Sequence, residues 1–275
     1  MNSKKGALKT VEKKDAWRFL PIETNDGPTN MAKDEAILEA RIKGIVPNTV
    51  RLYQWSPSTV TIGKHQSVSL EVDDEEINKR GFQLVRRISG GGAVLHAENM
   101  EITYSVVAKR SDLVKQFPDI PPTVDGIYHV ILMVIQKTMD KISLATEKGV
   151  IHCPALFIGD KKFSGNAQCI KKNVILQHGT ILLTVDPVVM YSVLKPPEGV
   201  TKGRMVRSVK AKVMGIEDHL GKKIDPLDFN DKYKQSFSEM LDAPLVDGNL
   251  TKEEEQHVVE LRKKYESDKW RMKYK

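Results

Sequence analysis

The chain has little cysteine and no long apolar run. Its 275 residues include two cysteines, Cys153 and Cys169, too few for a disulfide framework, so we expect a reducing compartment, the cytoplasm. No apolar run reaches the roughly 18 residues that a spanning helix needs, so the sequence predicts no membrane segment. Residues 1–14 are polar and Lys-rich without an apolar signal core, so we expect a flexible basic tail and no secretion signal.

Basic residues outnumber acidic ones, but they form no nucleic-acid-binding pattern. The chain has 43 Lys and Arg against 36 Asp and Glu, a net charge of +7. The lysine pairs are spread along the chain, and no aromatic residues are interleaved with a basic cluster. We therefore expect no nucleic-acid partner. The excess charge would instead steer an acidic protein partner or keep the protein soluble.

The most informative segment runs from Arg86 to His96 and reads Arg-Arg-Ile-Ser-Gly-Gly-Gly-Ala-Val-Leu-His. A glycine triplet lets a ligand approach a row of backbone N–H donors, and paired arginines supply forked positive charge, so the segment predicts an anion site. The alternative is a wide hairpin loop with solvated arginines. The segment is neither a Walker A loop nor a dinucleotide fingerprint, because a strand-like run follows the glycines.

A second segment reads as two strands, residues 159–168 and 174–183, the first leading out of a hairpin turn at Gly159-Asp160. Small residues at Ser164, Gly165 and Ala167 leave space on a strand face, which often marks the close approach of a ligand. Lys162 stands at the edge of that space and can reach an anion held by the glycine loop. The alternative is that Lys162 is an ordinary solvated charge.

Together the two segments resemble the lipoate–protein ligase A family. Its pattern is Arg-Arg-x-Ser/Thr-Gly-Gly-Gly-Ala-Val, then Lys-x-Ser-Gly-Asn/Ser-Ala-Gln, then Gln-His-Gly, matched here at residues 86–94, 162–168 and 177–179. The likeness covers about residues 15–271 and includes 51–63, 101–107 and 264–270. Three motifs in the same order are far more specific than any one of them.

The resemblance implies an α/β (α+β) fold, shared with class II aminoacyl-tRNA synthetases and biotin–protein ligases. It has a mainly antiparallel mixed sheet with flanking helices, and one catalytic domain over residues 15–275. Such enzymes activate lipoate with ATP and Mg²⁺ to lipoyl-adenylate and pass the lipoyl group to a lysine. The implied acceptors are lipoyl domains of 2-oxoacid dehydrogenase E2 subunits and the glycine cleavage H protein. A separate accessory-domain polypeptide is a further implied partner.

The resemblance also assigns site residues. Lys162 matches the catalytic lysine, while metal ligands are not identified. The nucleotide and adenylate contacts are Arg87, Gly92, Ala93, Val94, Leu95 and Lys162. The lipoate pocket is formed by Arg86, Ser89, Gly90, Gly91, His96, Gly165, Ala167, His178 and Gly179. For the acyl tail itself we expect Val94, Leu95 and Phe163, although strand interior explains the same residues.

Three departures from the family pattern leave two other functions open. The chain ends just after Trp270 without the accessory domain, Pro154-Ala155 replaces an Asn-Asp pair, and His96-Ala97 replaces His-Asp. Loss of the Asn-Asp carboxylate puts adenylation in doubt. Related octanoyl- and lipoyl-transferases instead pass the acyl group through a cysteine thioester without ATP. A third hypothesis is a non-catalytic acyl-domain binder, against which the retained Arg87 and Lys162 argue.

Cys153 is the alternative nucleophile under the transferase hypothesis. It lies nine residues before Lys162, and His152 or Lys162 can stabilise its thiolate. Otherwise Cys153 is a small buried hydrophobe, the usual fate of a free cysteine. The sequence-based prediction remains an ATP-dependent lipoate–protein ligase.

Periodicity predicts the remaining elements. Strands are expected at 17–23, 51–55, 59–63, 82–88, 92–96 and 101–109, and helices at 30–43, 73–80, 124–141, 188–194, 225–241 and 251–265. Thr251 and Glu254 form a capping-box pattern at the start of the last helix. Residues 198–208 are expected to be an exposed loop that forms part of a lid.

Overall fold

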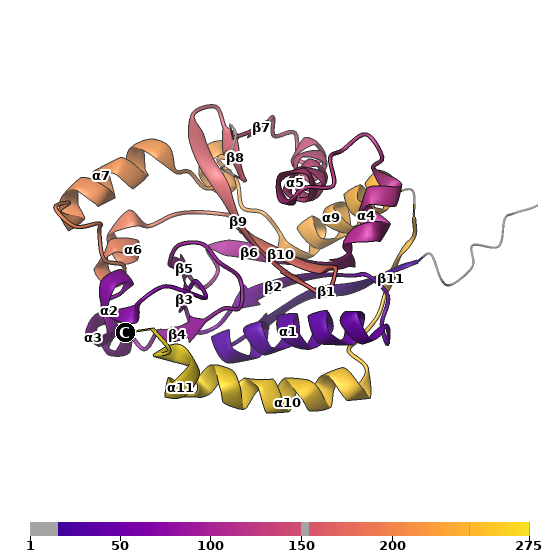
Figure 1. Ribbon diagram of the computed structural model, residues 1–275. Helices are drawn as coiled ribbons and strands as arrows, with labels where there is room; N and C mark the ends of the chain where they lie inside the picture. The colour runs from indigo at the N-terminus through magenta and orange to yellow at the C-terminus, as the bar shows by residue number, and fades with distance from the viewer. Residues whose placement is uncertain (1–15, 150–153, 242, 275) are drawn as a thin grey trace, which may run out of the picture.

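The computed structural model describes residues 16–149, 154–241 and 243–274. Two sheets lie at its centre (Figure 1). The larger has the strand order β11-β1-β2-β6-β10-β9-β8-β7 and the smaller the order β4-β3-β5. The strands of the larger sheet are β1 (Trp17–Asn25), β2 (Thr49–Trp55), β6 (Glu101–Lys109), β7 (Glu147–Lys148), β8 (Ala155–Ile158), β9 (Lys161–Lys171), β10 (Val174–Leu182) and β11 (Leu245–Asp247). Those of the smaller sheet are β3 (Thr59–Ile62), β4 (Gln83–Arg86) and β5 (Val94–His96).

The larger sheet is mainly antiparallel. Strands β2, β6, β10, β9, β8 and β7 pair antiparallel in that order, whereas β1 pairs parallel with both β2 and β11. The predicted mixed α/β fold is thereby confirmed, as is the hairpin at Gly159-Asp160, which joins β8 to β9. Strands β9 and β10 pair continuously from Ile181↔Ser164 to Val174↔Lys171, so residues of the second and third motifs lie side by side.

Helices cover both faces of the larger sheet. Figure 1 shows α1 (Gly27–Lys43) and α10 (Lys252–Glu266) below it and α5 (Val124–Asp140) and α9 (Pro226–Leu241) above it. Helix α1 begins where the Asp26 side chain accepts a hydrogen bond from Thr29 N (2.9 Å), and it ends at Gly44, whose φ of 76° suits glycine. The capping box predicted for α10 is confirmed, because Thr251 Oγ1 and the Glu254 carboxylate each accept the other residue's backbone N–H.

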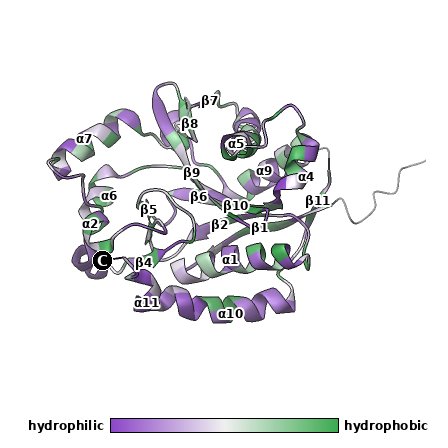
Figure 2. Cartoon of the chain, viewed as in Figure 1, coloured by the Kyte–Doolittle hydropathy of each residue, from purple (hydrophilic) through white to green (hydrophobic). Residues whose placement is uncertain are grey.

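The core lies between the sheet and helix α5. Ile131 and Ile135 of α5 pack with Val106, Ile175 and Phe163 of the sheet, and all five are fully buried. Green, hydrophobic colour gathers on α5 in Figure 2. Complete burial of such a side chain contributes about 1.5–3 kcal/mol, so this layer fixes the strands that carry the site.

The structure corrects the prediction of a loop at residues 198–208. Helix α7 (Lys202–Lys212) begins there, because the Thr201 side chain caps it by accepting from Arg204 N (3.2 Å). The segment consists mostly of helix-forming residues after Thr201, and its single glycine, Gly203, does not stop the helix. Val209 turns inward and is buried.

The remaining helices are short and lie at the periphery. They are α2 (Val68–Glu71), α3 (Asp74–Lys79), α4 (Arg110–Gln116), α6 (Pro187–Val193), α8 (Ile216–Leu220) and α11 (Asp268–Arg271). Within the ranges that the structure describes, no helix combines the length and the apolar character needed to cross a bilayer. The predicted tail, residues 1–14, and Cys153 lie outside those ranges.

Candidate active site

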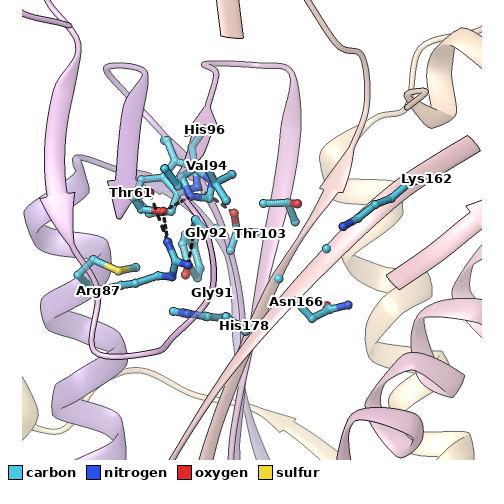
Figure 3. Close-up of a pocket in the computed structure, with 18 residues that line it drawn as sticks. Thr61, Arg87, Gly91, Gly92, Val94, His96, Thr103, Lys162, Asn166 and His178 are labelled. Atoms are coloured by element: carbon cyan, nitrogen blue, oxygen red, sulfur yellow. Dashed lines mark hydrogen bonds between the residues drawn. The ribbon is translucent and has the colours of Figure 1, made fainter. Parts of the chain in front are cut away.

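A cavity of about 280 Å³ opens between the small sheet and strands β9 and β10 (Figure 3). Eleven of the sequence-predicted residues line it: Arg87, Gly91, Gly92, Ala93, Val94, His96, Lys162, Gly165, Ala167, His178 and Gly179. The glycine loop forms one wall and the small residues of β9 and β10 form the facing wall, so the structure brings the three motifs together.

Arg87 holds the glycine loop in shape. Its Nη2 donates to the carbonyls of Gly90 and Gly92, each at 2.7 Å, and its Nε donates to Ser89 Oγ at 3.1 Å. Its Nη1 donates to Thr61 Oγ1 at 3.1 Å. Burial lowers the pKa of Arg87 to about 10, so the guanidinium still carries its charge at neutral pH. Because every N–H group of Arg87 has a partner within the chain, the side chain shapes the loop and adds positive potential rather than offering an open fork to an anion.

Arg86 does not line the cavity, which corrects its predicted role in the lipoate pocket. Its guanidinium donates to the carbonyls of Gln66 (2.6 Å) and Arg271 (2.7 Å), and Trp270 Nε1 donates to the Arg86 carbonyl (2.7 Å). Successive side chains of a strand point to opposite faces, so two adjacent arginines cannot share one site. Arg86 instead fastens the C-terminal segment to β4.

Four other predicted residues also lie outside the cavity wall. Ser89 is fully buried beneath the loop, and Gly90 is absent from the lining. Leu95 packs in the apolar cluster beneath the small sheet and Phe163 in the main core. Leu95 and Phe163 are therefore core residues of their strands, as the alternative interpretation held. Of the three residues expected around the acyl tail, Val94 alone is among the described residues that line the cavity.

Lys162 stands at the cavity on β9, where Gly165 leaves room for its side chain. A Cβ atom at Gly165 would lie 3.3 Å from both Cε and Nζ of Lys162. The Lys162 carbonyl accepts from Met214 N (3.0 Å), which fixes the backbone. Among the described residues, Lys162 Nζ has no hydrogen-bond or salt-bridge partner, so it is available to a ligand (Figure 3).

Several lining residues escaped the sequence analysis: Met31, Tyr53, Trp55, Thr61, Thr103, Asn166 and Thr180. The Trp55 ring stacks on His96 with centroids 4.1 Å apart, and Trp55 Nε1 donates to Thr103 Oγ1 at 2.8 Å. His96 Nε2 lies 3.0 Å from Thr61 Oγ1. These contacts give a rigid wall with an apolar surface, suited to an apolar chain. The segments that resemble the family, 51–63, 101–107 and 162–168, contain five of these residues, whereas Met31 and Thr180 lie outside them.

His178 is held in one orientation by a buried hydrogen-bond chain. Its Nδ1 lies 3.0 Å from Asp34 Oδ2, and its Nε2 lies 2.6 Å from Ser89 Oγ. Burial acts to raise the pKa of Asp34, but the hydrogen bond from His178 and the charge of Arg51 outweigh burial and hold the pKa below its ordinary value. An ionised Asp34 fixes the proton on Nδ1, so Nε2 accepts from the Ser89 hydroxyl, which in turn accepts from Arg87.

The order Ser89-His178-Asp34 has the form of a hydrolase triad, but it does not have that function. Ser89 has no exposed surface and does not line the cavity, so its hydroxyl cannot reach a substrate carbonyl. The chain of hydrogen bonds therefore positions the glycine loop against β10.

Asn166 connects the cavity wall to the start of β8. Its Nδ2 donates to the Pro154 carbonyl at 2.6 Å, and its Oδ1 accepts from the Tyr104 hydroxyl. Cys153 precedes Pro154 in the sequence and is not among the described residues.

The described lining does not fit a magnesium site. It contains no Asp or Glu, and nowhere in the described ranges do three or more His, Cys, Asp or Glu residues group as metal ligands. Mg²⁺ prefers carboxylate and other oxygen ligands in octahedral geometry. The mechanism proposed below therefore assigns no reaction step to the expected Mg²⁺.

Residues 26–238 match the family described as the lipoyl protein ligase A/B catalytic domain. The chain belongs to this family. It is similar to the octanoyltransferase LipM of Kyrpidia tusciae, with 34% identity over 92% of this chain and 97% of the relative. LipM of Geobacillus kaustophilus is also 34% identical, over 94% of this chain and 99% of the relative.

Solved lipoate ligases share the fold. A crystal structure of lipoate-protein ligase A bound with ATP is 25% identical, with a TM-score of 0.78 over 94% of this chain and 98% of that one. The bipartite lipoate protein ligase of Thermoplasma acidophilum, solved in a study of that ligase and its E2 lipoyl domain, has a TM-score of 0.79. It is 24% identical over 94% of this chain and 96% of that one.

The comparisons contradict the ATP-dependent ligase prediction. The relatives that match at 34% identity across nearly their whole length are named octanoyltransferases, a name for acyl transfer and not for ATP-driven ligation. The chain is thus an enzyme of the lipoate ligase and transferase family, and the transferase alternative is better supported than the ligase. ATP and Mg²⁺ were expected as cofactors because of the ligase prediction, so these two expectations are not supported either.

Proposed function

We propose that this protein transfers an octanoyl group from a thioester donor to the ε-amine of a lysine on a lipoyl acceptor domain, without ATP. One observation carries the proposal: the Lys162 ammonium has no hydrogen-bond or salt-bridge partner among the described residues, and it faces a cavity whose described lining is largely apolar and has no carboxylate. The similarity to enzymes named octanoyltransferases selects the acyl group. The acceptors that the family implies are E2 lipoyl domains and the glycine cleavage H protein.

The cavity suits one short acyl chain. Its volume of about 280 Å³ lies just below the roughly 300–1,000 Å³ typical of small-molecule sites. Val94, Ala93 and Met31 offer apolar surface, and the Trp55–His96 stack forms a rigid part of the wall. Lys162 lies where the polar carbonyl end of such a chain would meet positive charge.

Cys153 is the nucleophile in this proposal. The chain has two cysteines, and Cys169 is absent from the cavity lining. Burial raises the pKa of the Cys169 thiol, which lowers its thiolate content near neutral pH. Cys153 directly precedes Pro154, whose carbonyl is bound by Asn166 of the cavity wall.

Two acyl exchanges complete the reaction. The Cys153 thiolate attacks the donor thioester carbonyl, a new C–S bond forms, and the donor leaves as its thiolate. The acceptor lysine, as a neutral amine, then attacks the Cys153 thioester, an amide forms, and the amine proton neutralises the departing thiolate. The Lys162 ammonium stabilises the oxyanion in both steps. No ATP is needed, because the thioester is already activated.

The test is the intact mass of an apo-lipoyl domain incubated with this protein and octanoyl-coenzyme A, in the absence of ATP. The proposal predicts a mass increase of one octanoyl group, lost in Cys153→Ala and retained in the matched Cys169→Ala. If the acceptor gains mass solely from free acid and ATP, the protein is a ligase after all. If octanoyl-coenzyme A binds but no acceptor is modified, the protein is a non-catalytic acyl-domain binder.

A further inference from the structure

Helix α7 (Lys202–Lys212) is a basic surface. It carries five cationic residues and no acidic one, and all five are exposed: Lys202, Arg204, Arg207, Lys210 and Lys212. In Figure 2, hydrophilic and hydrophobic residues alternate along α7, in keeping with one face turned to the protein and one to solvent. Val209 and its apolar neighbours form the inner face.

Most of the cationic side chains of α7 lack a carboxylate partner among the described residues. Lys202 lies 3.4 Å from Asp73, but the other four cations have no salt-bridge partner in the part of the chain that the structure describes. Helix α10 differs, because it carries acidic as well as basic residues. Two of its cations are paired with carboxylates, Arg262 with Glu266 and Asp26, and Lys264 with Glu35. An uncompensated cationic face lowers the stability of the free protein slightly and favours an acidic partner.

Helix α7 is joined directly to the strand of Lys162. Met214 N, just beyond the helix, donates to the Lys162 carbonyl at 3.0 Å, and Val213 bridges Lys162 in parallel. Figure 1 shows α7 extending outward beside the β8–β9 hairpin, on the side of the molecule away from α10. At 11 residues, the helix offers a surface about 16 Å long, and its C-terminal end adjoins the backbone of Lys162.

We propose that the exposed face of α7 docks the acceptor domain through acidic residues that surround its acceptor lysine. This inference rests on the proposed function for the identity of the acceptor. A lysine side chain is short, so the domain that carries it must lie against the surface bordering Lys162. Carboxylates around that lysine complement α7 and offset the repulsion between the incoming amine and the positive pocket.

The decisive variant removes three charges from α7 and is matched by one that removes three charges elsewhere. The first is Arg204→Gln/Arg207→Gln/Lys210→Gln. The control is Lys43→Gln/Lys252→Gln/Lys263→Gln, at exposed positions on α1 and α10 that lack salt-bridge partners among the described residues. Both variants change the net charge equally, so a difference between them reports the position of the charges.

The measurement is calorimetric titration of an apo-lipoyl domain into each protein at low ionic strength, where charge interactions are weakly screened. The Kd is expected to rise about tenfold in the α7 variant, and by less than about twofold in the control. The charge-conserving variant Arg204→Lys/Arg207→Lys/Lys210→Arg should keep the wild-type Kd, which separates charge from folding. Equal effects in the α7 variant and its control, or no effect in either, would overturn the proposal.

Kinetics separate this inference from the proposed function. With octanoyl-coenzyme A as donor, the α7 variant should show a raised KM for the acceptor and an unchanged kcat. If the wild-type protein binds the acceptor through α7 but transfers nothing, the proposed function fails and the docking surface stands. If the α7 variant loses affinity solely for an acidic octanoyl carrier protein, the surface serves the donor and the inference is wrong.

Discussion

His178 Nδ1 lies 3.0 Å from Asp34 Oδ2, a contact that joins β10 to helix α1 across 144 positions of the sequence. Through Ser89, which lies 2.6 Å from His178 Nε2, the same imidazole supports the loop that ends in the glycine triplet. The shape of the cavity therefore depends on a carboxylate that does not line it. This dependence can be tested without any substrate.

Replacing Asp34 by Asn should destabilise the fold strongly. Asp34 is buried and contacts Arg51 at 3.1 Å, so neutralising it leaves a buried guanidinium with only the partly exposed Glu23 as a carboxylate partner in the described structure. We expect the free energy of unfolding to fall by about 3 kcal/mol, measured by urea denaturation. Lys171→Gln breaks a pair nearer the surface, with Lys171 49% and Glu39 24% exposed, and should change the free energy of unfolding by less than about 1 kcal/mol. Equal effects of the two substitutions would show that the Asp34 network does not hold the fold.

Because of the same carboxylate, the stability of the protein should fall once the pH drops below about 3.8, the ordinary pKa of the group. The pKa of Asp34 is held below its ordinary value of 3.8, so the folded state binds its proton more weakly than the unfolded state does. This stabilisation is fully present above the unfolded pKa and is lost as the pH falls through the folded value. Unfolding free energies measured from pH 7 to pH 3 should fall more steeply for the wild type than for Asp34→Asn. If the unfolding free energies of the two proteins fall in parallel with pH, the pKa of Asp34 is not lowered in the folded state.

Gly165→Ala should slow acyl transfer without unfolding the protein. The added Cβ would lie 3.3 Å from Lys162 Nζ, and the end of this flexible side chain can move aside. We expect a roughly tenfold lower transfer rate, because the ammonium is displaced from the acyl carbonyl, and a stability change within about 1 kcal/mol. Gly203→Ala is the control, since its new Cβ would meet nothing closer than Arg207 Nη1 at 3.8 Å. A wild-type rate in Gly165→Ala would mean that the position of Lys162 is not critical.

Arg87→Lys should loosen the glycine loop. A lysine ammonium cannot reproduce the forked contacts to the carbonyls of Gly90 and Gly92. Amide hydrogen exchange at residues 90–92 should accelerate, and the KM for the acyl donor should rise about tenfold. Arg80→Lys, on an exposed helix end, should change neither quantity. If Arg87→Lys exchanges like the wild type, the loop is held by other contacts.

Much of the fold could be predicted because its periodic segments are long. Strand 101–109 and helix 124–141 were predicted to within one residue of β6 and α5, since burial on one or both faces leaves a clear apolar pattern. Helix α7 was missed because the nearby Pro196-Pro197 and Gly203 resemble loop signals, while its Thr201 cap was overlooked.

Within the candidate site, the sequence predicted the residues that lie close together in short motifs. The glycine loop, Lys162 and His178 lie in compact motifs, and the structure places all of them at one cavity. Trp55 and Thr103 were missed, because they meet through pairing of distant strands. Arg86 was misplaced because strand alternation was not applied to the arginine pair. The ligase prediction was wrong for a different reason: the family motifs are common to ligases and transferases, so they do not distinguish the two activities.

The most direct test of the account is the intact mass of this protein after brief exposure to octanoyl-coenzyme A alone, without ATP or acceptor. We predict one added octanoyl group that peptide mapping assigns to Cys153, that hydroxylamine removes, and that an apo-lipoyl domain discharges. Cys169→Ala should acquire the same group and Cys153→Ala should not. An octanoyl group that forms equally in Cys153→Ala, or transfer to the acceptor that persists in that variant, would contradict the thioester mechanism.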